Sequence, residues 1–140
     1  MPATKSTRTG HLPTAGELRL LRILWERGEA TVDDIVNAHP QRSRPNYKTT
    51  QTLLRIMEEK GFIAHTSRGR VFVFRPLVSQ RIVDQRCIQS LLSRNFGGSA
   101  SGLFLNLLDA RKIKDKDLDE IEAQIREYRR KNGRSPQSRV

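Results

Sequence analysis

The chain has 140 residues, of which 36% are hydrophobic, enough for one ordinary domain or two small ones that share a core. Its formal charge of +11 at pH 7 and its isoelectric point near 10.8 indicate an anionic partner, with nucleic acid favoured over a membrane surface. The single cysteine, Cys87, excludes an intramolecular disulfide and a cysteine zinc cluster. The polar start and the lack of a long apolar run give no sign of a secretory signal or membrane span, so we expect a cytoplasmic protein.

The first ordered element is a helix that begins after Thr14. Residues 1–12 before it are rich in Thr, Lys and Arg without periodicity, and we expect a disordered basic arm there. Thr14 and Glu17 have the spacing of a capping box, in which each side chain bonds the other residue's backbone N–H. Leucines then recur at helical spacing as far as Leu24, and Gly28 can end the helix in a left-handed conformation.

A second, short helix follows, with Thr31 as its cap. Asp33 and Asp34 lie in its first turn, where negative charge is favoured by the helix dipole. The helix ends before Pro40, because the residue preceding a proline is pushed out of the helical region.

A third helix is predicted from Asn46, its cap, to Lys60, with Gly61 after its end. One of its faces is predicted to point inward, and the residues on it are Tyr47, Thr50, Leu53, Leu54 and Met57. The other face is polar and basic.

Two short runs rich in β-branched and aromatic residues follow, over residues 62–66 and 71–76. The polar loop between them, 67–70, contains Gly69, so the pattern predicts a β-hairpin. Three helices and then a hairpin are the element order of a winged helix-turn-helix, which we predict for residues 13–78. The fold class is therefore mostly α with a small β-hairpin.

The remainder is predicted to be helical over residues 79–132, with a basic, flexible tail at 133–140. Helices are expected near 79–95, 103–108 and 118–128, and their apolar stripes exceed what so short a segment could bury by itself. We predict a dimerisation domain, the alternative being that the stripes pack on the winged helix. The predicted dimer contacts are Leu91, Leu92, Leu103, Phe104, Leu107, Leu108, Leu118, Ile121 and Ile125.

The polar face of the third helix is predicted to bind DNA. Lys48, Gln51 and Arg55 lie on one side of it, and an α-helix fits the major groove, where such side chains can pair with guanine or adenine and the Thr52 methyl with thymine. The alternative is an ordinary solvated helix face. Including phosphate contacts from the preceding turn, the helix start and the wing, the predicted DNA-binding residues are Arg42, Arg44, Asn46, Lys48, Thr49, Gln51, Thr52, Arg55, Arg68 and Arg70.

Other chemistry finds no support in the sequence. The three histidines are scattered and are expected to be ordinary surface or turn residues, and Cys87 is expected to be a small apolar residue of a helix. Since no nucleophile motif, phosphate loop or metal signature occurs, we predict no catalytic function, no cofactor and no metal.

The segment from Lys48 to Leu54, followed by 60–63, resembles the reading-helix signature of the BlaI/MecI/CopY penicillinase-repressor family. The first helix, with Glu17 and the pair Leu24–Trp25, is similar to that family's opening helix. Residues 103–106 and 118–121 resemble its dimerisation region more loosely. The resemblance covers roughly residues 12–130.

This resemblance implies a homodimer that binds double-stranded DNA at an inverted repeat, with half-sites of the TACA/TGTA type. Its DNA contacts would fall on Lys48, Thr49, Gln51, Thr52 and Arg55, with Arg68 or Arg70 on the wing. One departure concerns base preference: the family's common arginine in this turn aligns closer to Ile56 than to Arg55.

The resemblance also bears on regulation. Metal-responsive members carry a cysteine-rich C-terminal motif, whereas this chain has Cys87 alone, which argues against thiolate metal sensing. Antibiotic-responsive members are inactivated by a membrane sensor metalloprotease that cuts after an Asn in the dimerisation region, and the matching bond here is Asn106–Leu107. The alternative is that Asn106 is a polar residue of a helix surface.

Two rival functions fit the same elements. The winged helix could serve protein–protein contact, with its basic surface incidental, or the chain could be a repressor that responds to a small molecule.

Overall fold

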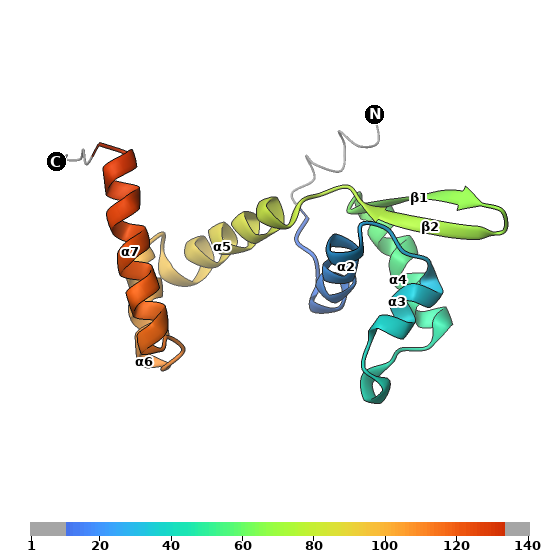
Figure 1. Cartoon of the computed structure of the whole chain (residues 1–140), viewed down its shortest axis with the longest axis horizontal. Coiled ribbons are helices and arrows are strands. Elements are labelled where there is room, and N and C mark those ends of the chain that lie inside the picture. Colours follow the sequence, from blue (N-terminus) through green and yellow to red (C-terminus); the bar gives the residue numbers. More distant parts are fainter. Residues whose placement is uncertain (1–10, 134–140) are drawn as a thin grey trace. The chain divides into compact units, whose positions relative to one another are not determined.

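The computed structural model describes residues 11–133, which fall into two compact units (Figure 1). One unit ends at Ser90 and the other begins at Leu91. The predicted basic arm at 1–12 and the tail at 133–140 therefore lie almost wholly outside the described residues.

Between residues 11 and 78 the first unit contains three α-helices, and the sequence predicted all three. They are α2 (Ala15–Arg27), α3 (Val32–Ala38) and α4 (Tyr47–Lys60), with a short 3₁₀ turn at Gln41–Ser43 between the last two. The predicted capping box is present: the backbone N–H of Glu17 donates to Thr14 Oγ1 at 3.2 Å, and that of Thr14 donates to Glu17 Oε1 at 2.9 Å.

The boundaries of α4 also follow from local chemistry. Asn46 Oδ1 accepts the backbone N–H of Thr49 at 2.7 Å, and Gly61 takes the left-handed conformation, with a φ of +88°, at the other end. Because four backbone N–H groups at a helix start lack partners within the helix, this cap fixes where α4 begins.

The predicted hairpin is confirmed, with a tighter turn than expected. Strands β1 (Ile63–Arg68) and β2 (Val71–Pro76) are antiparallel, and their last pair is Arg68 opposite Val71. The turn is thus only Gly69 and Arg70, and the expectation of a four-residue loop over 67–70 is wrong. Gly69 has a φ of +65°, which suits the first residue of a two-residue hairpin turn.

An isolated β-bridge supports the wing and was not predicted. Ala30 and Phe74 exchange backbone hydrogen bonds of 2.9 and 2.8 Å, which tie the α2–α3 connection to β2. The indole N–H of Trp25 donates to the carbonyl of Val78 at 2.8 Å and so holds the chain where it leaves the hairpin.

The core of the first unit lies where the three helices and β2 meet. Its fully buried side chains include Leu21, Leu24, Ile35, Leu54 and Met57. The inward stripe predicted for α4 is correct for Thr50, Leu54 and Met57 but wrong for Tyr47, which is 49% exposed. Since residues 46–49 are all exposed, the first turn of α4 projects beyond the edge of the core.

The C-terminal part is helical, as predicted. Its elements are α5 (Gln80–Phe96), α6 (Ala100–Asp109) and α7 (Asp115–Lys131), the last extending beyond the predicted end near Tyr128. The start of α5 belongs to the first unit, where Val83 is buried and Cys87 packs against the core. None of the helices within residues 11–133 has the length and apolar character needed to cross a membrane.

The described residues of the second unit, 91–133, differ from the first unit because none of their side chains is fully buried. Each of them is exposed or half-buried. The molecule is thus a winged helix-turn-helix with a C-terminal helical region, as the sequence predicted.

Candidate nucleic-acid interface

The outward face of α4 brings four of the predicted DNA-binding side chains together. They are all exposed and lie opposite the buried Thr50, Leu54 and Met57, so the core holds the helix while this face stays free: Lys48, Gln51, Thr52 and Arg55. We call these four residues the reading face. Arg55 also lies 3.8 Å from Glu59 one turn later, with both side chains about two-thirds exposed, so solvent screens this pair.

The start of α4 offers hydrogen-bond donors as well. Asn46 is exposed, but its carbonyl oxygen is occupied by the cap to Thr49, which leaves its amide N–H₂ group for a phosphate. The exposed Thr49 hydroxyl lies three residues further on, at a helix N-terminus that favours anions.

The two arginines before α4 differ in their surroundings. Arg42 lies in the 3₁₀ turn and is exposed. Arg44 donates from Nη2 to the carbonyls of Asn37 at 3.2 Å and His39 at 3.1 Å, and so caps the end of α3. Its side chain therefore stabilises the turn, and only the rest of its guanidinium group can face DNA.

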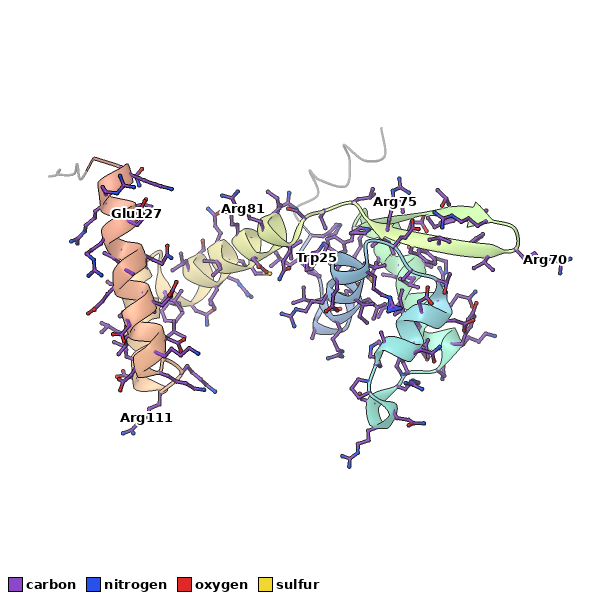
Figure 2. All side chains as sticks on the ribbon, viewed as in Figure 1. Trp25, Arg70, Arg75, Arg81, Arg111 and Glu127 are labelled. Atoms are coloured by element: carbon purple, nitrogen blue, oxygen red, sulfur yellow. The ribbon has the colours of Figure 1, made fainter. Side chains whose placement is uncertain are left out.

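The two arginines of the wing also differ. Arg70 projects from the tip of the hairpin (Figure 2). Arg68 forms a two-pronged ion pair with Glu29, at 3.0 and 3.1 Å, which the sequence did not suggest. Because Glu29 is half exposed, this pair is solvent-screened, and Glu29 occupies the groups of Arg68 that a phosphate would bind.

A cluster between α4 and the hairpin was missed by sequence reasoning. His65 Nδ1 donates to both carboxylate oxygens of Glu58, at 2.9 and 2.8 Å, and the ring stacks on Phe72 with 4.2 Å between centroids. A pocket of about 330 Å³ lies here, and its lining residues are Gln51, Thr52, Arg55, Glu58, His65, Phe72 and Phe74. We call it the helix–wing notch. The only signal for it was the alternation of β1, which puts His65 on the same side as the buried Ile63.

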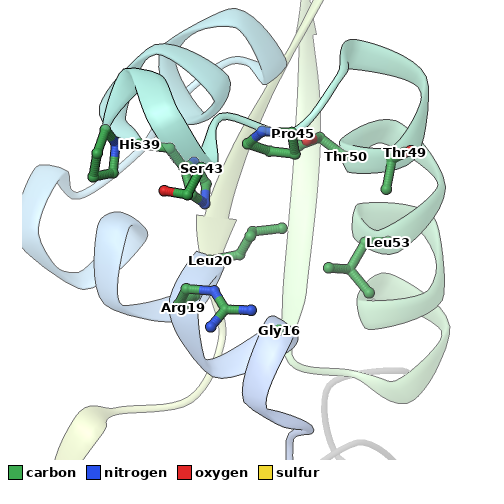
Figure 3. A pocket seen from close by; sticks show the side chains of 10 residues that line it. Gly16, Arg19, Leu20, His39, Ser43, Pro45, Thr49, Thr50 and Leu53 are labelled. Atoms are coloured by element: carbon green, nitrogen blue, oxygen red, sulfur yellow. The ribbon is translucent and has the colours of Figure 1, made fainter.

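A second pocket, of about 570 Å³, lies between α2, the turn before α4 and the first half of α4 (Figure 3). Arg19 brings a cation to it, opposite Ser43 and Thr49. Nothing in the sequence pattern indicated that this side of α2 borders α4. His39 also lines the pocket, and of the two expected settings, surface or turn, it has the second: it ends α3, is 9% exposed and donates from Nδ1 to the carbonyl of Ile35 at 2.9 Å.

In the described part of the chain one carboxyl group, that of Asp34 in α3, has a clearly shifted pKa. The pKa of Asp34 is lowered below its ordinary 3.8, chiefly because the backbone N–H of Thr31 donates to its carboxylate at 3.0 Å. Thr31 Oγ1 accepts from Asp34 in return, at 3.1 Å. This reciprocal cap orders the start of α3, which precedes the turn to the reading helix.

The residues predicted for dimerisation lie on all three helices of the C-terminal part. Leu92, Leu103, Phe104, Leu118 and Ile121 are half-buried, and the other four are exposed. Asn106 is exposed within α6 and donates from Nδ2 to the carbonyl of Gly102 at 3.2 Å, so the Asn106–Leu107 bond is helical.

Comparison with known proteins gives one family match. The family model described as penicillinase repressor matches residues 13–127. The penicillinase repressor of Bacillus licheniformis is 24% identical over 113 residues, which are 81% of this chain and 88% of that protein. The methicillin resistance regulatory protein MecI of Staphylococcus aureus (strain N315) is 19% identical over 108 residues, or 77% of this chain and 88% of MecI.

Two solved structures are also similar over about half of the chain. The solution structure of the DNA-binding domain of the repressor BlaI matches with a TM-score of 0.44 and 27% identity, covering 48% of this chain and 82% of that one. The CopR repressor structure matches with a TM-score of 0.42 and 35% identity, covering 49% of this chain and all of that one.

Proposed function

The chain belongs to the penicillinase repressor family, and on that premise we propose that it is a homodimeric transcriptional repressor that occupies an inverted-repeat operator. The observation that carries this proposal is the reading face, four exposed polar side chains on a helix whose opposite side is anchored in the core. In this role the chain is not a catalyst, and it acts in the cytoplasm, where an operator is accessible.

The chemistry of the reading face suits half-sites of the TACA/TGTA type. Gln51 can pair with adenine N6 and N7, the Thr52 methyl can pack on the thymine methyl, and Lys48 or Arg55 can reach guanine O6 and N7. Asn46, Thr49, Arg42 and Arg70 supply phosphate contacts, which set the register without reading sequence. Arg44 and Arg68 belong to this outer set, each shared with its partner in the protein.

Dimerisation is supported by the absence of fully buried side chains in the described residues of the second unit. Its helices carry the leucine and isoleucine stripes described above, yet no side chain within residues 91–133 is buried. Apolar surface of this extent is stabilised when another copy covers it, and a two-fold dimer matches the two-fold symmetry of an inverted repeat.

Relief of repression by a membrane sensor metalloprotease is the second part of the proposal. The bond to be cut, Asn106–Leu107, is exposed but helical, so α6 must open locally before a protease can bind it as an extended strand. A dimer that covers α6 would resist cleavage, whereas a separated protomer would be cut.

The test is selection of bound sequences from a random pool of duplex DNA. We expect recovery of an inverted repeat whose half-site spacing reports the dimer geometry. Lys48→Ala should then lower the affinity for the selected operator by about 1–3 kcal/mol and relax specificity at one base pair.

Two outcomes contradict the proposal. Unchanged operator affinity in Lys48→Ala means that the reading face is wrongly assigned. No binding of any duplex at low salt favours the rival function of a protein–protein contact module.

A further inference from the structure

Glu58 and His65 connect the reading helix to the wing. Glu58 lies near the end of α4 and His65 in the middle of β1, and one imidazole nitrogen, Nδ1, donates to both carboxylate oxygens. Both side chains are about one-third exposed, so the pair is shielded in part from water and from salt. Its hydrogen bonds join the last turns of α4 to β1 directly, from side chain to side chain.

The imidazole ring is held in place from its other side. Phe72 is stacked on it with 22° between the ring planes, and Phe74, its partner across the strands, lies at 5.5 Å. Aromatic pairs with centroids this close attract each other. The wing therefore contacts α4 through a cluster of three rings, and the imidazole of this cluster bonds the Glu58 carboxylate.

This pair lines the helix–wing notch, between the reading face and the wing. In B-DNA one sugar–phosphate strand separates the major groove from the neighbouring minor groove. A duplex that receives α4 in its major groove and the wing tip at the next groove must pass that strand across the notch. Glu58 thus lies where phosphates approach.

A free carboxylate at that place would repel the phosphates, and a carboxylate bonded to His65 does so less, because its two oxygens already accept hydrogen bonds. The other charged groups of the notch and its rim are Arg55 and, paired with it, Glu59. The hydrogen bonds between Glu58 and His65 also hold the wing against α4. They therefore set the distance between the reading face and Arg70 at the wing tip.

We propose that the Glu58–His65 pair positions the wing against the reading helix, so that base contacts and phosphate contacts fit the same operator register. The pair then contributes to sequence specificity more than to affinity for DNA in general. The inference rests on the proposed function, since it names two positioning residues of the same site.

The experiment compares Glu58→Gln with a matched control, Glu59→Gln. Both changes remove one negative charge from the last turns of α4, but Glu59 pairs with Arg55 on the same helix and leaves the wing untouched. Each protein is titrated with the operator obtained by selection and with a shuffled duplex of the same composition, at one salt concentration. Thermal unfolding of each variant checks that it is folded at the titration temperature.

Both variants should bind the shuffled duplex slightly and equally tighter, since each loses one charge that repels phosphate. The ratio of operator to shuffled affinity should fall about tenfold in Glu58→Gln, as for the loss of one charge-assisted hydrogen bond. In Glu59→Gln it should change by less than about twofold. An unchanged ratio in Glu58→Gln, or an equal fall in both variants, overturns the inference.

A second variant separates positioning from simple repulsion. His65→Ala leaves Glu58 unpaired, so binding of both duplexes should weaken, and adding Glu58→Gln should restore the shuffled duplex but not the operator ratio. Independent, additive effects of the two changes on the ratio contradict a pair that acts as one unit. If the wild-type protein itself does not prefer the selected duplex, the proposed function fails and this inference fails with it.

Discussion

Thr50 lies next to the predicted DNA contact Thr49, but on the buried side of α4. It is 2% exposed on the inner side of α4, and its hydroxyl is the one buried side-chain polar atom without a hydrogen-bond partner in the described part of the chain. A buried hydroxyl that lost its water and gained no partner destabilises the fold. Its neighbour Thr49, fully outside the core, carries no such cost.

We therefore expect Thr50→Val to raise the free energy of unfolding by about 1 kcal/mol, because it replaces the unpaired hydroxyl with a methyl group. The measurement is urea unfolding, with Thr49→Val as the control that should change stability by less than about 0.5 kcal/mol. Operator affinity should fall only in the Thr49 variant. A less stable Thr50→Val protein would mean that the hydroxyl has a partner after all.

The lowered pKa of Asp34 predicts that the stability of the fold depends on pH. Its pKa is lowered in the folded protein, first by the hydrogen bond from the Thr31 backbone, so the ionised carboxylate stabilises the fold. This contribution is fully present above the ordinary value of 3.8 and disappears as the pH falls through the lower folded value. The difference in thermal midpoint between wild type and Asp34→Ala should therefore be constant near neutrality and shrink below about pH 4. A difference that persists unchanged at pH 2 would argue against a role for the charge.

At the scale of elements, a partly buried ion pair joins α2 to α4. Glu17 is 2% exposed, and Lys60 Nζ donates to both its oxygens at 2.8 and 3.1 Å. Lys60→Met leaves this carboxylate without its cation, and we expect a loss of about 2 kcal/mol, less than for a fully buried pair because Lys60 is about one-quarter exposed. Arg55→Met, which breaks the exposed pair with Glu59, should cost less than about 0.5 kcal/mol.

The double variant Glu17→Gln with Lys60→Met should recover most of that stability, since no buried charge then remains. Chemical denaturation of the four proteins of the cycle measures the coupling. If the two single changes add without coupling, the pair does not join the helices energetically.

Elements whose ends depend on local chemistry were predictable from the sequence. The box of Thr14 with Glu17, the cap at Asn46 and the left-handed Gly61 are set by residues three or four positions apart, and all three are where the pattern put them. Contacts between distant segments were not predictable, because nothing in one segment specifies its partner. Arg44 on the carbonyls of α3 and the bridge of Ala30 to Phe74 are of this kind.

The candidate site likewise has residues that a local pattern predicts and contacts that only the folded structure reveals. The helical period alone puts Lys48, Gln51 and Arg55 on one side, and the structure exposes all three. The same period wrongly predicted that Tyr47 is buried, because periodicity does not indicate how far along the helix the core extends. The pairing of Glu58 with His65 was not predictable, because it depends on how the hairpin folds back on α4.

At the scale of the whole molecule, we expect the proposed dimer contacts of the second unit to control the affinity for the operator. Ile121→Asp puts a charge in the apolar stripe of α7, and we expect a monomer by light scattering. Its affinity for a complete operator should fall about 100-fold or more, because two linked half-sites bind far more tightly than one. Binding to a duplex with a single half-site should be unchanged.

Ala123→Asp is the matched control, since it adds the same charge on the opposite, exposed side of α7. It should remain dimeric and bind the full operator normally. A dimeric Ile121→Asp protein would contradict the assignment of this stripe, and an equal effect of both changes would indicate general damage to the helix.

No side chain within residues 91–133 is buried, so in the proposed dimer the folding of this segment depends on the concentration of chains in the cell. A segment that is stable only when a second copy covers it melts at a temperature that rises with protein concentration, by mass action. As growth dilutes the chains, the unpaired fraction increases, and unfolded helices are the forms that cellular proteases degrade. Gene dosage and protein turnover would then tune repression together, with a response steeper than proportional.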